Sequence, residues 1–236
     1  WSGAYRQAPA ASGGVTACQG PFWRRRAGRG VNTARRAVIL YRVPPADVPN
    51  IVLASGSPRR SQLLAGLGLT FTVVVPEVDE TPARGEAPGA LVERLARSKA
   101  RVVATGHHDA MVIAADTTVA VDGVILNKPV DEAENREFVA LLAGREHDVF
   151  TGHALAYRGA LETVVVRSAV VFRPLSEAEI ARYCATGEGL DKAGGYAIQG
   201  RGAALIEGMR GCYPNVMGLS LVNVVLAARR LGVELV

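Results

Sequence analysis

The side chains that could do chemistry form a set of cations and carboxylates spread along the sequence. They are Arg59, Arg60, Lys99, Lys128, Glu80 and Asp116. Gathered cations suit a polyphosphate, and paired carboxylates suit the divalent metal ion that accompanies one. A carboxylate at a strand end could also be the base that activates water. These residue types predict a metal-dependent hydrolase of phosphate esters or anhydrides.

The motifs of several other enzyme classes are absent from the sequence, which holds no GxxxxGK[ST], no GxGxxG after a strand, no GxSxG and no HExxH. The four histidines show no metal-ligand spacing. The three cysteines, Cys18, Cys184 and Cys212, are widely spaced and odd in number. That pattern argues against a disulfide framework and a cysteine-ligated zinc site, and it is typical of a reducing compartment. We therefore expect a cytoplasmic protein.

Residues 51–60 (IVLASGSPRR) are predicted to form a buried strand that turns directly into a helix. Ser57 suits the N-cap and Pro58 the first helical position. Arg59 and Arg60 then lie in the first helical turn, beside N–H groups without a helical acceptor. With the hydroxyls of Ser55 and Ser57 they would form an anion site. The alternative is a capped helix with two solvated arginines.

Lysine is rare in this chain, since 24 of the 27 basic residues are arginine. The three lysines, Lys99, Lys128 and Lys192, are therefore candidates for roles that need a compact ammonium group. Lys99 lies near the apolar face of a helix predicted over residues 91–104. Glu80 belongs to a short acidic run after a strand, for which a metal or base cluster and a solvated loop both stay open.

An apolar strand is predicted over residues 111–115, and residues 116–118 are expected to interrupt it. Asp122 and Gly123 then predict a tight hairpin between residues 118–121 and 124–126. The returning strand can bring Lys128 near Asp116. Because an unpaired buried carboxylate is costly, Asp116 needs a nearby lysine or a metal ion.

The rest of the chain from Asn50 alternates strand and helix signals, which is typical of an α/β domain. Capping residues predict helices after Asp131 and Ser176. A glycine-rich loop over residues 187–202 carries isolated polar residues, a pattern typical of functional or mobile loops. One core helix is expected over residues 214–232.

Residues 1–46 hold eight arginines and no acid, and we expect them to form a disordered extension. A targeting peptide, a misassigned start, an upstream fusion remnant and a nucleic-acid-binding tail all remain open for it. Without those arginines, residues 47–236 carry 19 basic against 22 acidic residues, a net charge of −3. We therefore expect no nucleic-acid binding by the folded domain over residues 47–236. No apolar run approaches the length of a transmembrane helix, so no membrane partner is expected.

Several motifs, taken together and in order, resemble those of the Maf family of nucleoside triphosphate pyrophosphatases, also called septum-formation-inhibitor-like proteins. The resemblance runs from about residue 51 to residue 232. It rests on LASGSPRR (53–60), EVDETP (77–82), RLARSKA (94–100), AADTTV (114–119), ILNKP (125–129), GREHDVFTG (144–152), DKAGGYAIQG (191–200) and NVMGLSL (215–221). Departures from the family pattern are Asn127, His153 and Cys212.

The resemblance implies a mixed, elongated sheet flanked by helices, with two lobes and a cleft between them, as in ITPase-like folds. It implies hydrolysis of a nucleoside triphosphate to the monophosphate and diphosphate, with Mg²⁺ or Mn²⁺ as cofactor, and it suggests a homodimer. By motif position, the phosphate-binding residues would be Ser55, Arg59, Arg60, Lys99 and Lys128. Glu80 and Asp116 would serve the metal, and Asp116 would be the catalytic proton acceptor.

One branch of the family is specific for dTTP and UTP and carries Arg, Thr and Gln at three selector positions. Here these positions hold Arg59, Thr117 and Gln199, so the chain is similar to that branch. It would act in house-cleaning, on dTTP, UTP and possible modified pyrimidine nucleotides. Two alternatives stay open: a pyrophosphatase of the 7-methyl-GTP type, which carries Trp, Gln and Glu there, and a non-catalytic nucleotide-binding regulator of cell division.

Overall fold

The computed structural model describes residues 48–236, so the extension predicted over residues 1–46 lies outside the described residues. The elements are β1 (Ile51–Ala54), α1 (Pro58–Ala65), β2 (Phe71–Val73), α2 (Pro88–Ala104), β3 (Met111–Val121), β4 (Val124–Leu126), α3 (Glu132–Leu142), β5 (Glu146–Tyr157), β6 (Ala160–Phe172), α4 (Glu177–Cys184), the 3₁₀ turns η1 (Ala193–Gly195) and η2 (Gly200–Leu205), β7 (Ile206–Arg210), α5 (Tyr213–Met217) and α6 (Leu221–Arg230). None of the helices in this part of the chain combines the length and apolar character needed to cross a bilayer.

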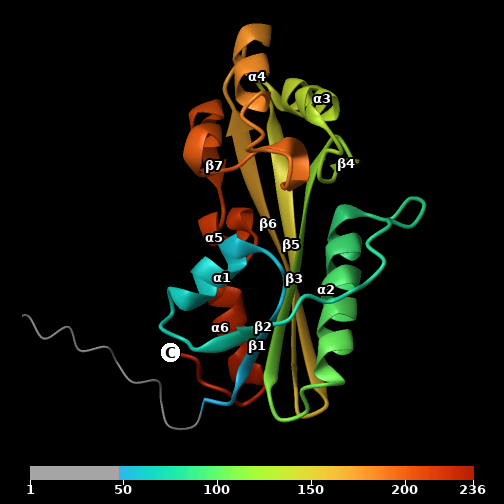
Figure 1. The fold of residues 1–236 in the computed structure, drawn as a ribbon, viewed down its shortest axis with the longest axis vertical. Coiled ribbons are helices and arrows are strands. Elements are labelled where there is room, and N and C mark those ends of the chain that lie inside the picture. The colour runs from blue at the N-terminus through green and yellow to red at the C-terminus, as the bar shows by residue number, and fades with distance from the viewer. Residues whose placement is uncertain (1–47) are drawn as a thin grey trace, which may run out of the picture. The chain divides into compact units, whose positions relative to one another are not determined.

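Seven strands form one sheet in the order β2-β1-β3-β5-β6-β7, with β4 beside the far end of β3. β1 runs parallel to β2 and β3, and the other pairs are antiparallel. Helix α2 covers one face of the sheet, and α1 and α6 cover the other (Figure 1). The predicted mixed α/β sheet is confirmed.

The core divides between two ends of the sheet. At the β1 end, one apolar cluster joins the sheet to α1 and α6, and a second joins it to α2. At the β4 end, a third cluster packs α3 and α4 against β3, β5 and β6. Strands β3, β5 and β6 extend from one end of the sheet to the other, so these strands connect the two predicted lobes.

Strand β3 is longer than β1 and β4, the two strands that pair with it along one edge. Residues 111–114 pair with β1 and residues 119–121 pair with β4. Between them, residues 115–118 have no strand partner on that edge within the described chain. The expected interruption at residues 116–118 is wrong, because β5 pairs with β3 throughout and aligns Asp116 with Gly152. The sheet therefore contains a gap in one edge, not a break in a strand.

The single helix expected over residues 214–232 is also wrong. Two helices, α5 and α6, occupy that stretch, and Gly218 separates them with a left-handed φ of +111°. Such a backbone conformation ends a helix and favours glycine. The predicted hairpin turn at Asp122–Gly123 is confirmed, with both residues at positive φ. The predicted capping by Ser176 is confirmed too.

Helix α2 approaches β5 unusually closely at Gly152. A Cβ atom at this position would lie 2.2 Å from the carbonyl oxygen of Val92, well inside van der Waals contact. The obstacle is backbone, so no change of side-chain rotamer could relieve it. Gly152 therefore sets how near α2 can lie to the sheet.

We expect Gly152→Ala to move α2 away from β5 and to lower the free energy of unfolding by about 3 kcal/mol or more, the upper range for overpacking. Urea denaturation of both proteins would measure this loss. Gly208→Ala in β7 is the matched control, because a Cβ there meets nothing within 4 Å. Equal stability of the two variants would contradict the proposed close contact.

Buried His153 joins β5 to the start of α6. Its Nε2 accepts a hydrogen bond from the Ser220 N–H at 2.8 Å, which leaves Nδ1 to donate to the Val164 carbonyl at 3.3 Å. The imidazole is therefore held neutral in one tautomer. Burial lowers the pKa of His153 to about 4 from its usual 6.5.

Because unfolded His153 binds a proton below pH 6.5 and the folded residue does so only near pH 4, its contribution to stability is lost as the pH falls through this interval. Between pH 7.5 and 5 the loss from this residue should be about 2 kcal/mol. Urea denaturation at both pH values would show a smaller decrease for His153→Gln, whose amide does not titrate. Equal decreases in wild type and variant would rule the effect out.

Candidate functional site

The turn from β1 into α1 forms one wall of a cavity of about 390 Å³. Ser57 stands at the N-cap and Pro58 in the first turn of α1, as predicted. The Ser57 side chain makes no capping hydrogen bond, and its N–H donates to the Ser55 hydroxyl at 3.2 Å. The first N–H groups of α1 therefore face the cavity without a side-chain cap, which suits an anion.

Arg60 is fixed by three hydrogen bonds in this wall. Its Nε donates to the Gly218 carbonyl at 2.8 Å, one terminal nitrogen donates to Ser55 Oγ at 3.0 Å, and the other donates to Thr117 Oγ1 at 3.0 Å. Burial lowers the pKa of Arg60, although the Asp116 carboxylate favours its charged form. A guanidinium group has five N–H bonds, so two remain for a ligand.

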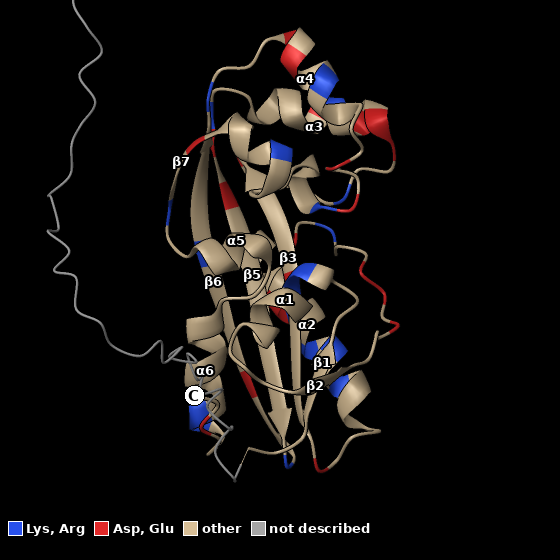
Figure 2. Cartoon of the chain, turned by 60° about the vertical axis from the view of Figure 1, so that its left-hand side comes forward, with Lys and Arg blue, Asp and Glu red and all other residues tan. Residues whose placement is uncertain are grey.

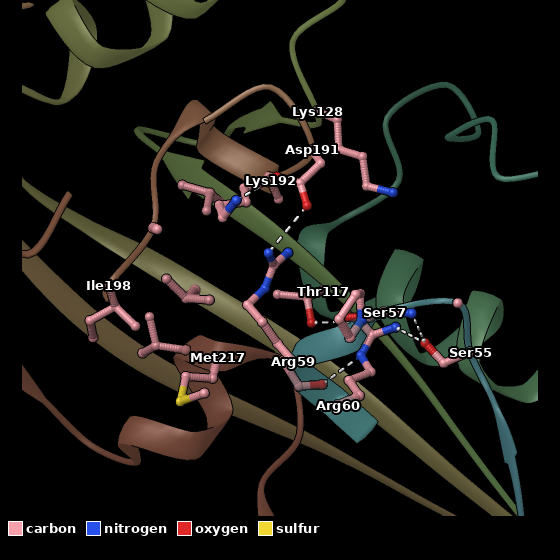
Figure 3. A pocket seen from close by; sticks show the side chains of 18 of the residues that line it. Ser55, Ser57, Arg59, Arg60, Thr117, Lys128, Asp191, Lys192, Ile198 and Met217 are labelled. Atoms are coloured by element: carbon pink, nitrogen blue, oxygen red, sulfur yellow. Dashed lines mark hydrogen bonds and ion pairs between the residues drawn. The ribbon is translucent and has the colours of Figure 1, made fainter. Parts of the chain in front are cut away.

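Arg59 points across the cavity instead, toward the glycine-rich loop (Figure 3). Its Nη1 lies 3.2 Å from Oδ2 of Asp191, and both side chains are solvent-accessible. Lys192 contacts the other oxygen of Asp191 and donates to the Glu188 carbonyl at 2.5 Å. This ion pair joins two opposite walls of the cavity.

Lys99 forms the charged centre of the site. Its Nζ lies 2.6 Å from Oδ1 of Asp116 and 2.6 Å from Oε1 of Glu80, so one ammonium group bridges two carboxylates. Lys99 and Asp116 are buried, whereas the Glu80 side chain is half exposed. Acidic and basic ribbon segments meet where α1 crosses the middle of β3 (Figure 2).

The two carboxylates differ in their acidity. Burial raises the pKa of Asp116 above its usual value, against the opposing effect of the nearby Lys99 ammonium. Burial also opposes ionisation of Glu80, but the hydrogen bond and charge of Lys99, with the charge of Lys128, lower its pKa overall. The protein thus shifts the two pKa values in opposite directions, upward for Asp116 and downward for Glu80.

The structure brings eight of the nine predicted site residues to this one cavity. They are Ser55, Arg59, Arg60, Glu80, Lys99, Thr117, Lys128 and Gln199. Asp116 is not in the lining but lies directly behind Lys99. The expected pairing of Asp116 with a lysine is confirmed, but its partner is Lys99 from α2, not Lys128, whose exposed side chain forms no ion pair within residues 48–236.

One part of the cavity is apolar. Ile198 and Met217 lie there, on the other side of Arg59 from Lys128 (Figure 3). The side chains of Val119, Val149 and Val216 extend this lining. The cavity therefore combines a charged region of phosphate-binding character with an apolar region that could hold a ring.

Sequence reasoning did not assign roles to several residues that shape the site. Asp191 and Lys192 were noticed only as polar residues in a glycine-rich loop, although the scarcity of lysine already singled out Lys192. Thr151 and Asn215 sit in motifs that resemble the family's. The contact of Thr151 with Thr117 depends on strand pairing, and its contact with the Asn215 carbonyl depends on α5. No pattern in the sequence indicates either contact.

The chain is similar to known proteins over most of its described length. A family model described as Maf-like protein matches residues 50–231. A Myxococcus xanthus protein named dTTP/UTP pyrophosphatase is 52% identical over 190 residues, which cover 80% of this chain and 96% of that protein. A Deinococcus radiodurans protein of the same name is 47% identical over 192 residues, covering 81% and 98%. A Staphylococcus aureus Ham1 structure matches 54% of this chain and 72% of its own at 18% identity, with a TM-score of 0.38.

Proposed function

This chain belongs to the Maf family, and we propose that it is a nucleoside triphosphate pyrophosphatase that hydrolyses dTTP and UTP to the monophosphate and diphosphate. The observation that carries the proposal is the single cavity in which Arg60, Lys99 and Lys128 gather around the start of α1, with Glu80 beside them. Relatives that share about half of its residues, over nearly their whole length, bear the name dTTP/UTP pyrophosphatase. Modified pyrimidine nucleotides are further candidate substrates in a house-cleaning role.

The phosphate chain lies in the charged region of the cavity. Arg60 offers its two remaining N–H bonds, a pair suited to two phosphate oxygens. Ser55, Lys128 and the free N–H groups at the start of α1 complete the binding set. Lys99 exchanges its carboxylate partners for a phosphate oxygen, and that exchange exposes Asp116 to the substrate.

The base lies in the apolar region, between Ile198 and Met217. Gln199 and Arg59 border this region and supply polar contacts that select a pyrimidine. Arg59 reaches the nucleotide only when it leaves Asp191. Substrate binding therefore replaces one ion pair across the cavity with contacts to the ligand.

A divalent cation fits the carboxylates of this site. Glu80 and Asp116 already direct one oxygen each at a single cation, the Lys99 ammonium. Within residues 48–236 no group of three His, Cys, Asp or Glu side chains could hold a metal. Two carboxylates with substrate phosphates and water are the usual Mg²⁺ environment. When bound, Mg²⁺ or Mn²⁺ supplies positive charge that stabilises the phosphate oxygens.

Asp116 takes the proton from the attacking water. The water oxygen bonds to the α-phosphorus, the bond from that phosphorus to the bridging oxygen breaks, and pyrophosphate leaves. The raised pKa of Asp116 suits a general base, because a more basic carboxylate accepts the proton more readily. Lys99, Lys128 and Arg60 stabilise the charge that builds up on the leaving group.

We also propose that the protein is cytoplasmic. We further propose that it forms a homodimer, and sedimentation of the purified protein would test this oligomeric state. The 7-methyl-GTP type would carry Trp, Gln and Glu where this chain has Arg59, Thr117 and Gln199. A regulator that only binds nucleotide would not need Asp116 as a base. A nucleotide panel distinguishes these possibilities.

Purified protein with Mg²⁺ or Mn²⁺ should release pyrophosphate from dTTP and UTP in preference to 7-methyl-GTP and the other nucleotides. Asp116→Asn removes the base and should lower kcat about 10³-fold, within the usual range for general-base catalysis. Asp109→Asn, at an exposed residue away from the cavity, is the matched control. A folded Asp116→Asn protein with full activity would exclude the assigned role, and no release by wild type would favour the regulator.

Lys99→Met should change metal and phosphate binding in opposite directions. Without the ammonium group, Glu80 and Asp116 are free for a cation, so Mn²⁺ affinity without nucleotide should rise about tenfold, or about 1.4 kcal/mol. Affinity for inorganic triphosphate should fall by a similar factor, because a phosphate ligand is lost. Electron paramagnetic resonance of free Mn²⁺ and calorimetry with triphosphate measure the two effects. Unchanged or weaker Mn²⁺ binding would show that Lys99 does not compete for the carboxylates.

A further inference from the structure

A chain of hydroxyl groups runs behind the cavity from Arg60 to helix α5. Thr117 Oγ1 lies 3.0 Å from Arg60 Nη2 and 3.0 Å from Thr151 Oγ1. Thr151 Oγ1 in turn lies 2.9 Å from the main-chain carbonyl of Asn215. Thr151 and Asn215 are fully buried, so water does not replace these contacts.

The direction of every proton in this chain is determined by its two ends. A carbonyl only accepts hydrogen bonds, so the Thr151 hydroxyl must donate to Asn215. Thr151 Oγ1 can then only accept, and the Thr117 hydroxyl must donate to it. Arg60 only donates, so Thr117 receives its N–H. One arrangement alone satisfies all three contacts.

This arrangement leaves Thr117 without a proton to offer a nucleotide base. Its single O–H is committed to Thr151, and one of its two lone pairs is committed to Arg60. A residue that read the base by donating a hydrogen bond would have to break the buried chain. Thr117 is instead suited to presenting an acceptor to Arg60.

Helix α5 holds both ends of the network. It supplies the Asn215 carbonyl to Thr151, and the Gly218 carbonyl at its C-terminus accepts from Arg60 Nε. The Asn215 side chain anchors the helix to the sheet, because its Nδ2 donates to Ser168 Oγ at 3.1 Å. The split between α5 and α6 at Gly218 is what turns this second carbonyl toward Arg60.

We propose that Thr117 and Thr151 are positioning residues that orient the Arg60 guanidinium for the phosphate chain, and that Thr117 does not donate a hydrogen bond to the base. The inference rests on the proposed triphosphate site, and it assigns to Thr151 a role in substrate binding although Thr151 does not line the cavity. Without the Thr117 hydroxyl, one terminal nitrogen of Arg60 loses its acceptor. Without the Thr151 hydroxyl, the Thr117 hydroxyl loses the partner that fixes its orientation toward Arg60. Both changes weaken phosphate binding.

Calorimetry with inorganic triphosphate tests the proposal without turnover. Thr117→Val and Thr151→Val should each weaken binding by about three- to tenfold, and the double variant should be no weaker than Thr117→Val alone, since both act through Arg60. Thr151→Val keeps the buried shape, and the Asn215 carbonyl still accepts from the Gly218 N–H at 2.9 Å, so the variant should fold. Thr163→Val in β6, whose hydroxyl has Glu93 as its one partner within residues 48–236, is the matched control and should bind as wild type does.

Thr151→Ser separates orientation from packing. It keeps the hydroxyl and loses a buried methyl group, so it should bind triphosphate as wild type does while melting at a lower temperature. Binding by Thr151→Ser weaker than by Thr151→Val would overturn the proposal in favour of a packing role. Additive losses in the double variant would overturn it as well.

Base selection gives the second readout. In Thr151→Val, whose side chain lies outside the cavity lining, the ratio of kcat/KM for dTTP to that for dCTP should stay within about twofold of wild type, with the effect confined to KM. A large change in this ratio in Thr151→Val with unchanged triphosphate affinity would overturn the proposal. If wild type released no pyrophosphate from dTTP, the proposed function would fail, while the calorimetric result would still test the network.

Discussion

The buried carboxylate of Asp116 is the constraint on which the site depends. An ionised group at this depth is costly unless a partner of opposite charge accompanies it, and removing one member of such a pair costs about 3–5 kcal/mol. The partner is Lys99, and its position follows from the place of α2 on the sheet. That place follows in turn from Gly152, which allows the helix backbone to approach β5. A stability requirement thus assembles the same two groups that the proposed reaction uses.

The gap in the sheet edge beside residues 115–118 explains why the candidate functional site lies at the middle of β3. β1 ends before it and β4 begins after it, so within the described residues no strand pairs with the middle of β3 on the edge opposite β5. Side chains alternate along a strand, so Asp116 turns toward α2 and Thr117 toward the face that α1 covers. Two adjacent residues therefore serve the carboxylate centre and the arginine network separately.

Local features of the sequence were the most predictable. The turn from β1 into α1 follows from Ser57 and Pro58, and the hairpin from Asp122–Gly123, because neighbouring residues determine such turns. Motif resemblance gathered eight residues that share one cavity. The partner of Asp116 could not be read from the sequence, because β3 and α2 meet only after folding. The continuity of β3 and the division of the last helix were missed for the same reason, since strand pairing and a carbonyl needed by Arg60 overrode local preference.

Because side chains alternate along β3, the number of residues in the strand determines which face of the sheet each site residue lies on. Ala114 is the last residue paired with β1, and Asp116 follows two positions later. One residue inserted between them would exchange the two faces, so that Ala115 or the inserted residue would meet Lys99 and the carboxylate of Asp116 would meet Arg60. An insertion at the Asp122–Gly123 turn would lengthen only the hairpin loop. Insertions and deletions that preserve the site are therefore confined to the chain after Thr118, such as the Asp122–Gly123 turn. The strand up to Thr118 must keep its length even where its residues change.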